Sequence, residues 1–142
     1  MIDLLAKELI SLLERDANQT SEKLAKQLSV SPSTIRRRIN TLIKHGVMRI
    51  VAIPEPKQIG LPLIAIVAFQ VSHEKTDSFL QMLSGKENVK CLYVTSGRFD
   101  AIALMWFSST EQLFEFMEKG VASLEGVKAT ETFICLHAEK SF

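Results

Sequence analysis

A turn of only three residues, 29–31, separates two helical patterns, and no other stretch constrains the fold of this chain as tightly. Before the turn, leucines recur at helical spacing behind Thr20, a residue type that favours the N-cap position. After it, Ser31 is placed to cap another helix, and Pro32 stands at the first helical position, where its missing N–H is not needed. Gly46 marks the end of that helix. Two helices joined by so short a turn are typical of a helix-turn-helix unit.

A further helix precedes this pair, with Asp3 as its N-cap and an end expected near Asn18. Its apolar residues recur at helical spacing and are Leu5, Leu9, Leu12 and Leu13. After Gly46, the β-branched run 47–53 predicts a strand. We therefore predict a winged helix-turn-helix domain over residues 1–53.

Charge is distributed unevenly along the chain. The formal net charge is only +1, yet residues 1–53 hold nine Lys/Arg against five Asp/Glu, whereas residues 54–142 hold eight against eleven. No acidic residue occurs from Lys23 to Pro54, a window that contains seven Lys/Arg. A stretch of one sign attracts polyanions, whereas a surface that serves only solubility mixes both signs. Nucleic acid is therefore the first candidate ligand of the N-terminal domain.

The helix after the turn has an apolar face and a polar face. The apolar stripe, which we expect to be buried, consists of Ile35, Ile39, Leu42 and Ile43. Arg37 points directly away from this stripe, with Arg36 and Arg38 on its flanks. Arginine can bridge guanine O6 and N7, asparagine can bridge adenine N6 and N7, and lysine or hydroxyl side chains can hold phosphate.

An arginine triplet can also serve only to keep a helix solvated. The capped turn and the acid-free window favour the other interpretation, in which this helix lies in the major groove of double-stranded DNA. The predicted DNA contacts are Ser31, Ser33, Thr34, Arg36, Arg37, Arg38, Asn40 and Lys44.

The stretch PEPKQIG, with two prolines and a glycine, predicts a hinge over residues 54–61. The remaining residues, 62–142, alternate between strand and helix patterns. The expected elements are a strand over 62–72, a helix over 74–84, strands over 89–96 and 100–107, a helix opened by the capping box 109–112, and a strand over 127–137. This βαββαβ order predicts a ferredoxin-like sandwich, so that the whole chain belongs to the α+β class.

Both faces of the predicted sheet carry apolar residues, although helices can cover only one of them. We expect the second face to be buried by self-association. No stretch reaches the roughly 18 apolar residues of a membrane span, and acids stand where a signal peptide needs basic residues. We expect a cytoplasmic protein without membrane contact. No nucleophile–base pair, metal-ligand spacing or glycine-rich phosphate loop occurs, so we expect no enzyme, cofactor or metal site.

Four stretches in the right order carry a resemblance to the Lrp/AsnC (leucine-responsive/asparagine regulator) family of prokaryotic transcription regulators. They are LAKQLSVSPSTIRRRINTLIKHGVM, the proline-flanked hinge before IGLPLIAIVAFQV, VTSGRFDAIALMWF, and LEGVKATETFICLHAEK. The resemblance implies a regulator that forms a homodimer through the C-terminal sandwich, commonly assembles into a tetramer of dimers, and binds a small effector, usually an amino acid, between dimers.

The resemblance also implies which residues line the effector cleft: Ser96, Gly97, Arg98, Phe99, Asp100, Thr130 and Thr132. The family often has a threonine at Ser96 and an acidic or small residue at Arg98, so the effector preference of this chain is expected to differ. Two hypotheses for Arg98 stand side by side: its guanidinium offers two donors to an effector carboxylate, or it pairs with Asp100.

An alternative function belongs to relatives with the same two-domain layout that are haem-precursor (sirohaem-type) decarboxylases, in which histidines and arginines bind tetrapyrrole carboxylates. The three histidines here, His45, His73 and His137, fall on three different predicted elements. A lone histidine is more often a surface or core residue than a catalyst, which favours the regulator.

Overall fold

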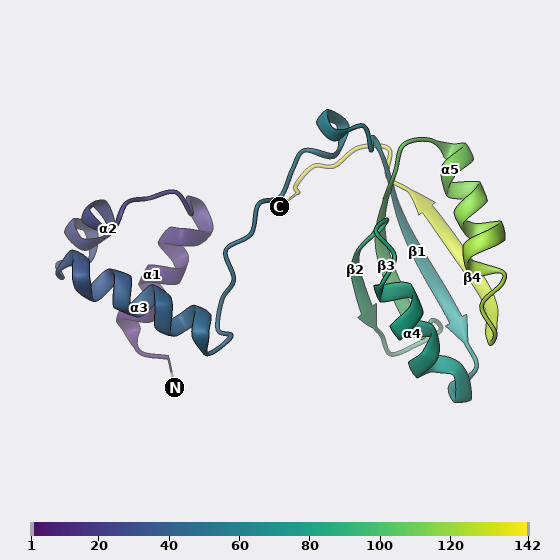
Figure 1. The fold of residues 1–142 in the computed structure, drawn as a ribbon, viewed down its shortest axis with the longest axis horizontal. Helices are drawn as coiled ribbons and strands as arrows, with labels where there is room; N and C mark the ends of the chain where they lie inside the picture. The colour runs from purple at the N-terminus through teal and green to yellow at the C-terminus, as the bar shows by residue number, and fades with distance from the viewer. Residues whose placement is uncertain (1, 142) are drawn as a thin grey trace. The chain divides into compact units, whose positions relative to one another are not determined.

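The structure, a computed structural model, describes residues 2–141 of the chain (Figure 1). The chain divides into two compact units, Met1–Ala52 and Ile53–Phe142, each with its own hydrophobic core. No helix among the described residues is long and apolar enough to cross a membrane.

The N-terminal unit consists of three helices: α1 (Leu4–Arg15), α2 (Ser21–Leu28) and α3 (Pro32–Lys44). Each begins at the predicted cap, because the side chains of Asp3, Thr20 and Ser31 accept hydrogen bonds from backbone N–H groups one turn ahead. α1 ends at Arg15, three residues before the predicted end. The turn between α2 and α3 contains Ser29 in the left-handed conformation, with φ of +54°. The helix-turn-helix prediction is confirmed.

The core of this unit forms where the apolar stripes of the three helices meet. Its buried members are Ala6, Leu9, Leu13, Leu24, Ala25, Ile35 and Leu42. Ile39 is half-buried against them, but Ile43 is 42% exposed, so the predicted stripe of α3 is wrong at its last member. Ile43 lies in the final turn of α3 at the edge of the stripe, where burial is least complete.

The strand predicted over residues 47–53 does not form. This segment contains no strand, so the described N-terminal residues have no wing. The run has the apolar, β-branched composition of a strand. A strand also requires a hydrogen-bonded partner strand, and the three helices supply none. Val47, Ile50, Val51 and Ile53 are consequently exposed.

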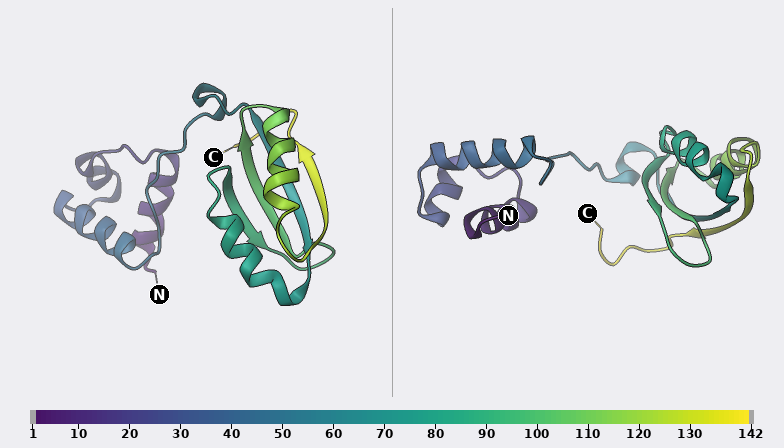
Figure 2. Two further views of the ribbon diagram at one scale, coloured as in Figure 1. Left: turned by 45° about the vertical axis from the view of Figure 1, so that its right-hand side comes forward. Right: turned by 90° about the horizontal axis from the view of Figure 1, so that it is seen from below.

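The C-terminal unit contains the predicted βαββαβ order: β1 (Leu63–Val71), α4 (Thr76–Ser84), β2 (Val89–Val94), β3 (Ala101–Phe107), α5 (Thr110–Glu115) and β4 (Val127–Ile134). The strands form one antiparallel sheet in the order β2-β3-β1-β4. Figures 1 and 2 show α4 and α5 on the same face of this sheet. A 3₁₀ turn (His73–Lys75) precedes α4, a π-helical turn (Phe116–Val121) continues α5, and a further 3₁₀ turn (Pro56–Ile59) lies in the predicted hinge. The predicted fold class is confirmed.

The helix-covered face of the sheet forms the second core. Alternate residues of β1 and β3, such as Phe69 and Met105, are fully buried under Phe79 and Leu83 of α4. The rings of Phe69 and Phe79 lie 5.1 Å apart between centroids. β4 ends at Ile134, three residues before the predicted end at 137, although the Cys135 N–H still donates to the Ile64 carbonyl of β1 at 2.9 Å.

The other face of the sheet is apolar but only partly covered. Phe133 lies opposite Ile66 and Tyr93 lies opposite Ile102. Tyr93 is 61% exposed and Phe133 51% exposed, so this open face is accessible to solvent within one chain. The prediction that both faces are apolar holds for the residue types, while the second face is only partly buried in the described chain.

Candidate DNA-binding surface and effector site

The outer face of α3 carries the predicted DNA contacts. Arg36, Arg37, Asn40 and Lys44 are exposed on this face, whereas Arg38 is half-buried. Helical spacing places Arg37, Asn40 and Lys44 on one side, opposite the buried Ile35. The surface therefore presents cationic and amide donors together, which is the chemistry needed for phosphate and base edges.

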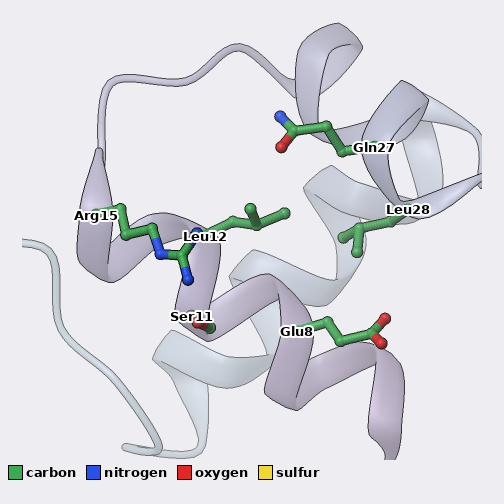
Figure 3. Close-up of a pocket in the computed structure, with 6 residues that line it drawn as sticks. All are labelled: Glu8, Ser11, Leu12, Arg15, Gln27 and Leu28. Atoms are coloured by element: carbon green, nitrogen blue, oxygen red, sulfur yellow. The ribbon is translucent and has the colours of Figure 1, made fainter.

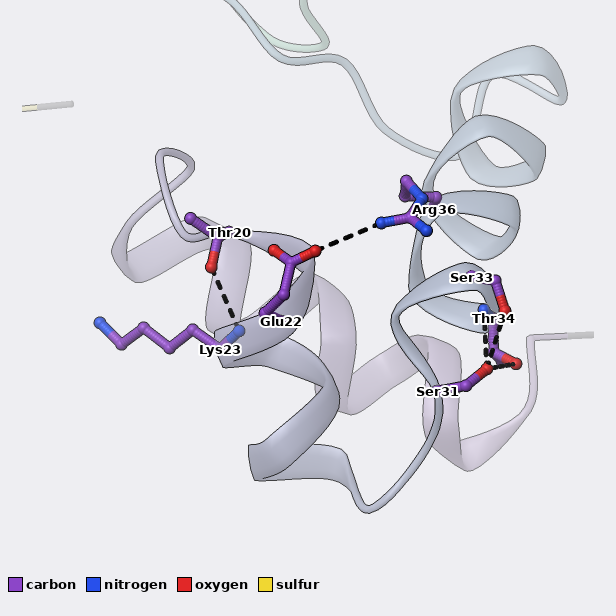
Figure 4. Close-up of polar contacts among 7 residues, drawn as sticks. All are labelled: Thr20, Glu22, Lys23, Ser31, Ser33, Thr34 and Arg36. Atoms are coloured by element: carbon purple, nitrogen blue, oxygen red, sulfur yellow. Dashed lines mark hydrogen bonds and ion pairs between the residues drawn. The ribbon is translucent and has the colours of Figure 1, made fainter.

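Two of the three consecutive arginines pair with acids inside the N-terminal unit. Arg36 lies 3.4 Å from a carboxylate oxygen of Glu22 (Figure 4), and Arg38 lies 2.7 Å from one of Asp3. The pKa of Asp3 is lowered, first by the hydrogen bond from the Ala6 N–H and also by the charge of Arg38. No such ion pair holds Arg37 in the part of the chain that the structure describes. Within the described residues, the triplet thus consists of two arginines in ion pairs and one, Arg37, that is available to bind an anion.

The start of α3 gathers three hydroxyl groups. Ser31 Oγ accepts from the Thr34 N–H at 3.2 Å and lies 3.0 Å from Ser33 Oγ and 2.8 Å from Thr34 Oγ1 (Figure 4). The N-terminus of a helix carries a partial positive charge, which favours phosphate at this end. The Ser31 hydroxyl caps the helix, and the hydroxyls of Ser33 and Thr34 both lie within hydrogen-bond distance of it.

A pocket in the N-terminal unit lies between α1 and α2 (Figure 3). It is lined by Glu8, Ser11, Leu12, Arg15, Gln27 and Leu28. None of the predicted DNA contacts lines it.

The turn between β2 and β3, residues 95–100, is held by several internal hydrogen bonds. Gly97 has φ of +104°, a conformation that glycine adopts without strain. The Thr95 hydroxyl donates to the Phe99 carbonyl at 2.8 Å, and the Thr95 N–H donates to the Asp100 carbonyl at 3.0 Å. The carboxylate of Asp100 accepts the Val71 N–H at 2.8 Å.

Arg98 does not pair with Asp100, so that hypothesis is wrong. Its guanidinium lies 2.8 Å from a carboxylate oxygen of Glu131 on β4 and stacks 4.8 Å from the centroid of the Phe99 ring. The Asp100 carboxylate is turned instead toward β1, where it accepts a hydrogen bond from the Val71 N–H. Sequence reasoning missed Glu131, because it is 33 residues from Arg98 and only the pairing of β4 with β1 brings the two together.

Thr130 and Thr132 lie on both sides of Glu131 along β4. Neighbouring residues of a strand point to opposite faces, so the two threonines lie on the opposite face of β4 from Glu131. The structure therefore brings Arg98 to Glu131 and not to these threonines. All three residues are accessible on this edge strand, and Ser96 is exposed in the turn.

His45 lies in the N-terminal unit, and His73 and His137 lie in different segments of the C-terminal unit. The His45 ring lies 2.8 Å from the Thr41 carbonyl at the end of α3, His73 opens the turn before α4, and His137 lies 3.5 Å from Glu139 after β4. Residues 2–141 also contain no group of three or more His, Cys, Asp or Glu side chains arranged to hold a metal ion.

Comparison with known families gives a match to each unit. Residues 64–142 match the family described as the Lrp/AsnC ligand binding domain, and residues 5–60 match the family described as the HTH domain.

Curated relatives match over nearly their whole length. A helix-turn-helix-type transcriptional regulator of Pyrococcus abyssi is 30% identical over 141 residues, which is 99% of this chain and 95% of the relative. The regulator LrpA of Pyrococcus horikoshii is 28% identical over 128 residues, covering 89% of this chain and 91% of the relative.

Solved structures show the same fold. AsnC of E. coli superposes with a TM-score of 0.87 at 24% identity, covering 100% of this chain and 97% of that one. A transcriptional regulator of Neisseria meningitidis, solved in complex with L-Met, superposes with a TM-score of 0.91 at 19% identity, covering 99% and 94%. The domain matches, the relatives and the confirmed fold agree, and they favour a regulator over a decarboxylase: the chain belongs to the Lrp/AsnC family of transcription regulators.

Proposed function

We propose that this regulator binds specific DNA sequences through the outer face of α3 and that a small effector, an amino acid, controls this binding. The observation that carries the proposal is Arg37, exposed and unpaired in the described chain, at the centre of a polar helix face on a helix-turn-helix. Residues 1–53 serve as the DNA-binding domain, residues 54–61 as the hinge, and residues 62–142 as the effector-binding and oligomerisation domain.

On the DNA, Arg37 and Asn40 read base edges in the major groove. Arg36, Arg38 and Lys44 contact phosphates, with the hydroxyls of Ser31, Ser33 and Thr34 at the start of α3. In the unbound chain Arg36 and Arg38 pair with Glu22 and Asp3, and on DNA the phosphates replace these acids as their partners.

The effector binds at the turn formed by Ser96, Gly97, Arg98, Phe99 and Asp100, beside the exposed strand that carries Thr130 and Thr132. An α-amino acid has a carboxylate and an ammonium a few bonds apart. Arg98 and Glu131 offer the two opposite charges next to each other, 2.8 Å apart. The complex of the Neisseria meningitidis regulator with L-Met makes L-methionine the first effector to test.

The open face of the sheet is the proposed dimer contact. Tyr93, Phe133 and Ile66 are exposed there, and burial of such side chains is a main favourable term in association. Dimers then assemble into a tetramer of dimers. Light scattering on two fragments tests this part: residues 61–142 should self-associate, while residues 1–53 should be monomeric. A monomeric C-terminal fragment would contradict the contact.

Selection of bound duplexes from random-sequence DNA tests the function as a whole. The full chain is expected to enrich a defined sequence, and the proteinogenic amino acids, added singly, should include at least one that shifts the binding midpoint. Failure to enrich any sequence would refute specific DNA binding, whereas enrichment that no amino acid alters would refute only the effector class.

A further inference from the structure

The end of the β1–β3 ladder leaves one buried backbone group in need of a partner. The last paired residues are Phe69 of β1 and Ala101 of β3, so Val71, two residues further along β1, lies beyond the ladder. Val71 is only 4% exposed, which denies its N–H a water molecule as an acceptor. A buried N–H without an acceptor is costly, so this group must be bonded by something other than strand β3.

Asp100 supplies the acceptor from its side chain. Its Oδ2 accepts the Val71 N–H at 2.8 Å, its own N–H donates to the Phe69 carbonyl at 2.9 Å, and its carbonyl accepts the Thr95 N–H at 3.0 Å. The neighbouring Phe99 carbonyl is occupied by the Thr95 hydroxyl. One residue therefore ties both ends of the turn to each other and to the end of β1.

We propose that Asp100 is a positioning residue, which fixes the turn 95–100 against β1 and acts on the effector through that geometry rather than by direct contact. This inference rests on the proposed function in one respect, namely that the turn binds the effector. The resemblance to the family placed Asp100 among the effector contacts, and its bond to Val71 gives it this different task.

The assignment decides which acid faces the effector. Two carboxylates are candidates to meet an effector ammonium at this turn, those of Asp100 and Glu131. The Asp100 carboxylate accepts a hydrogen bond from the backbone of β1, whereas the Glu131 side chain is 42% exposed and, among residues 2–141, is paired only with Arg98. A guanidinium has five N–H donors and a carboxylate has two oxygens, so both members of this pair can bind further groups. An effector ammonium therefore meets Glu131, and Asp100 holds the turn that presents Arg98.

Two substitutions at Asp100 separate positioning from contact. Asp100→Asn keeps an oxygen that can accept the Val71 N–H but removes the negative charge, while Asp100→Ala removes both. Hydrogen exchange of the Val71 amide in the effector-free full chain reports on the hydrogen bond between Asp100 and Val71. Calorimetric titration with the proteinogenic L-amino acids, L-methionine first, reports on effector binding.

With Asp100→Asn, Val71 exchange and effector affinity are both expected to stay within about threefold of wild type. With Asp100→Ala, Val71 exchange should accelerate by at least about tenfold and effector affinity should fall by a similar factor, the size expected for a lost hydrogen bond to a charged group. Glu131→Gln is the matched control, since it removes a nearby carboxylate while leaving the Val71 contact intact. It should weaken effector binding without changing Val71 exchange.

Loss of effector binding in Asp100→Asn with an unchanged Val71 amide would overturn the inference, because the charge itself would then contact the effector. Slow Val71 exchange retained in Asp100→Ala would overturn it too. If wild type binds none of the amino acids, the proposed effector class fails, while the exchange measurement still decides whether Asp100 braces the turn.

Discussion

Replacing Arg37 with alanine is expected to weaken specific DNA binding more than replacing either neighbouring arginine does. Arg37 is exposed on α3, and among residues 2–141 no ion pair holds its side chain. Arg36 and Arg38 each pair with an acidic side chain, and this ion pair must break before the arginine can bind DNA. The whole interaction energy of Arg37 with DNA therefore contributes to binding. Arg36 and Arg38 contribute only the difference between their interaction with DNA and their interaction with the acidic partner that they lose.

The magnitude follows from the type of contact. Loss of an arginine that bridges a guanine costs about 1–3 kcal/mol of binding free energy, roughly a 5-fold to 150-fold rise in Kd. Loss of a phosphate contact instead weakens binding evenly across sequences and reduces the salt slope by about 1. Because Arg37→Ala breaks no ion pair among the described residues, the Tm of the protein should not change.

Gel-shift titrations at two salt concentrations measure this prediction. The probes are the duplex selected by the wild-type protein and a scrambled duplex of the same composition. Lys23→Ala serves as the control, since this exposed lysine of α2 should change mainly the salt slope. The reasoning fails if Arg37→Ala binds the selected duplex as tightly as wild type does, or loses affinity equally for both duplexes.

Arg98→Glu is expected to abolish or invert effector preference in calorimetric titrations and to leave effector-free DNA binding intact; adding Glu131→Arg should restore the ion pair with its charges exchanged. Binding of every ligand as in wild type would remove Arg98 from the site. Gly126→Ala should lower the free energy of unfolding by about 1–3 kcal/mol in chemical denaturation, because a Cβ there would meet side-chain atoms. That Cβ would lie 2.5 Å from the nearest carbon, at φ of +92°, whereas Gly60→Ala, at φ of +79° with open space, should cost less. Asp3, whose pKa the fold lowers, stabilises the N-terminal unit above the unfolded pKa of its carboxyl, and this contribution should vanish as pH falls through the folded pKa. The stability difference between wild type and Asp3→Asn, followed by thermal unfolding from about pH 6 to about pH 2, should therefore shrink with acid.

Local patterns in the sequence were sufficient to predict the three helices of the N-terminal unit and the order of strands and helices along the C-terminal unit. The caps at Asp3, Thr20 and Ser31 act on backbone groups within one turn, so their effect is visible in a short window of sequence. The outward direction of Arg37 follows equally from helical spacing. For these features the interacting groups are neighbours along the chain.

Tertiary structure alone decided which partners the charged groups have and which apolar runs become strands. Residues 47–53 have the composition of a strand and remain unpaired, because hydrogen-bonded partners for a strand must come from elsewhere in the fold. The contact of Arg98 with Glu131 joins residues 33 apart, and that of Asp100 with Val71 joins residues 29 apart. Such contacts depend on strand register, and a register is fixed only when the sheet has formed and its core face is packed.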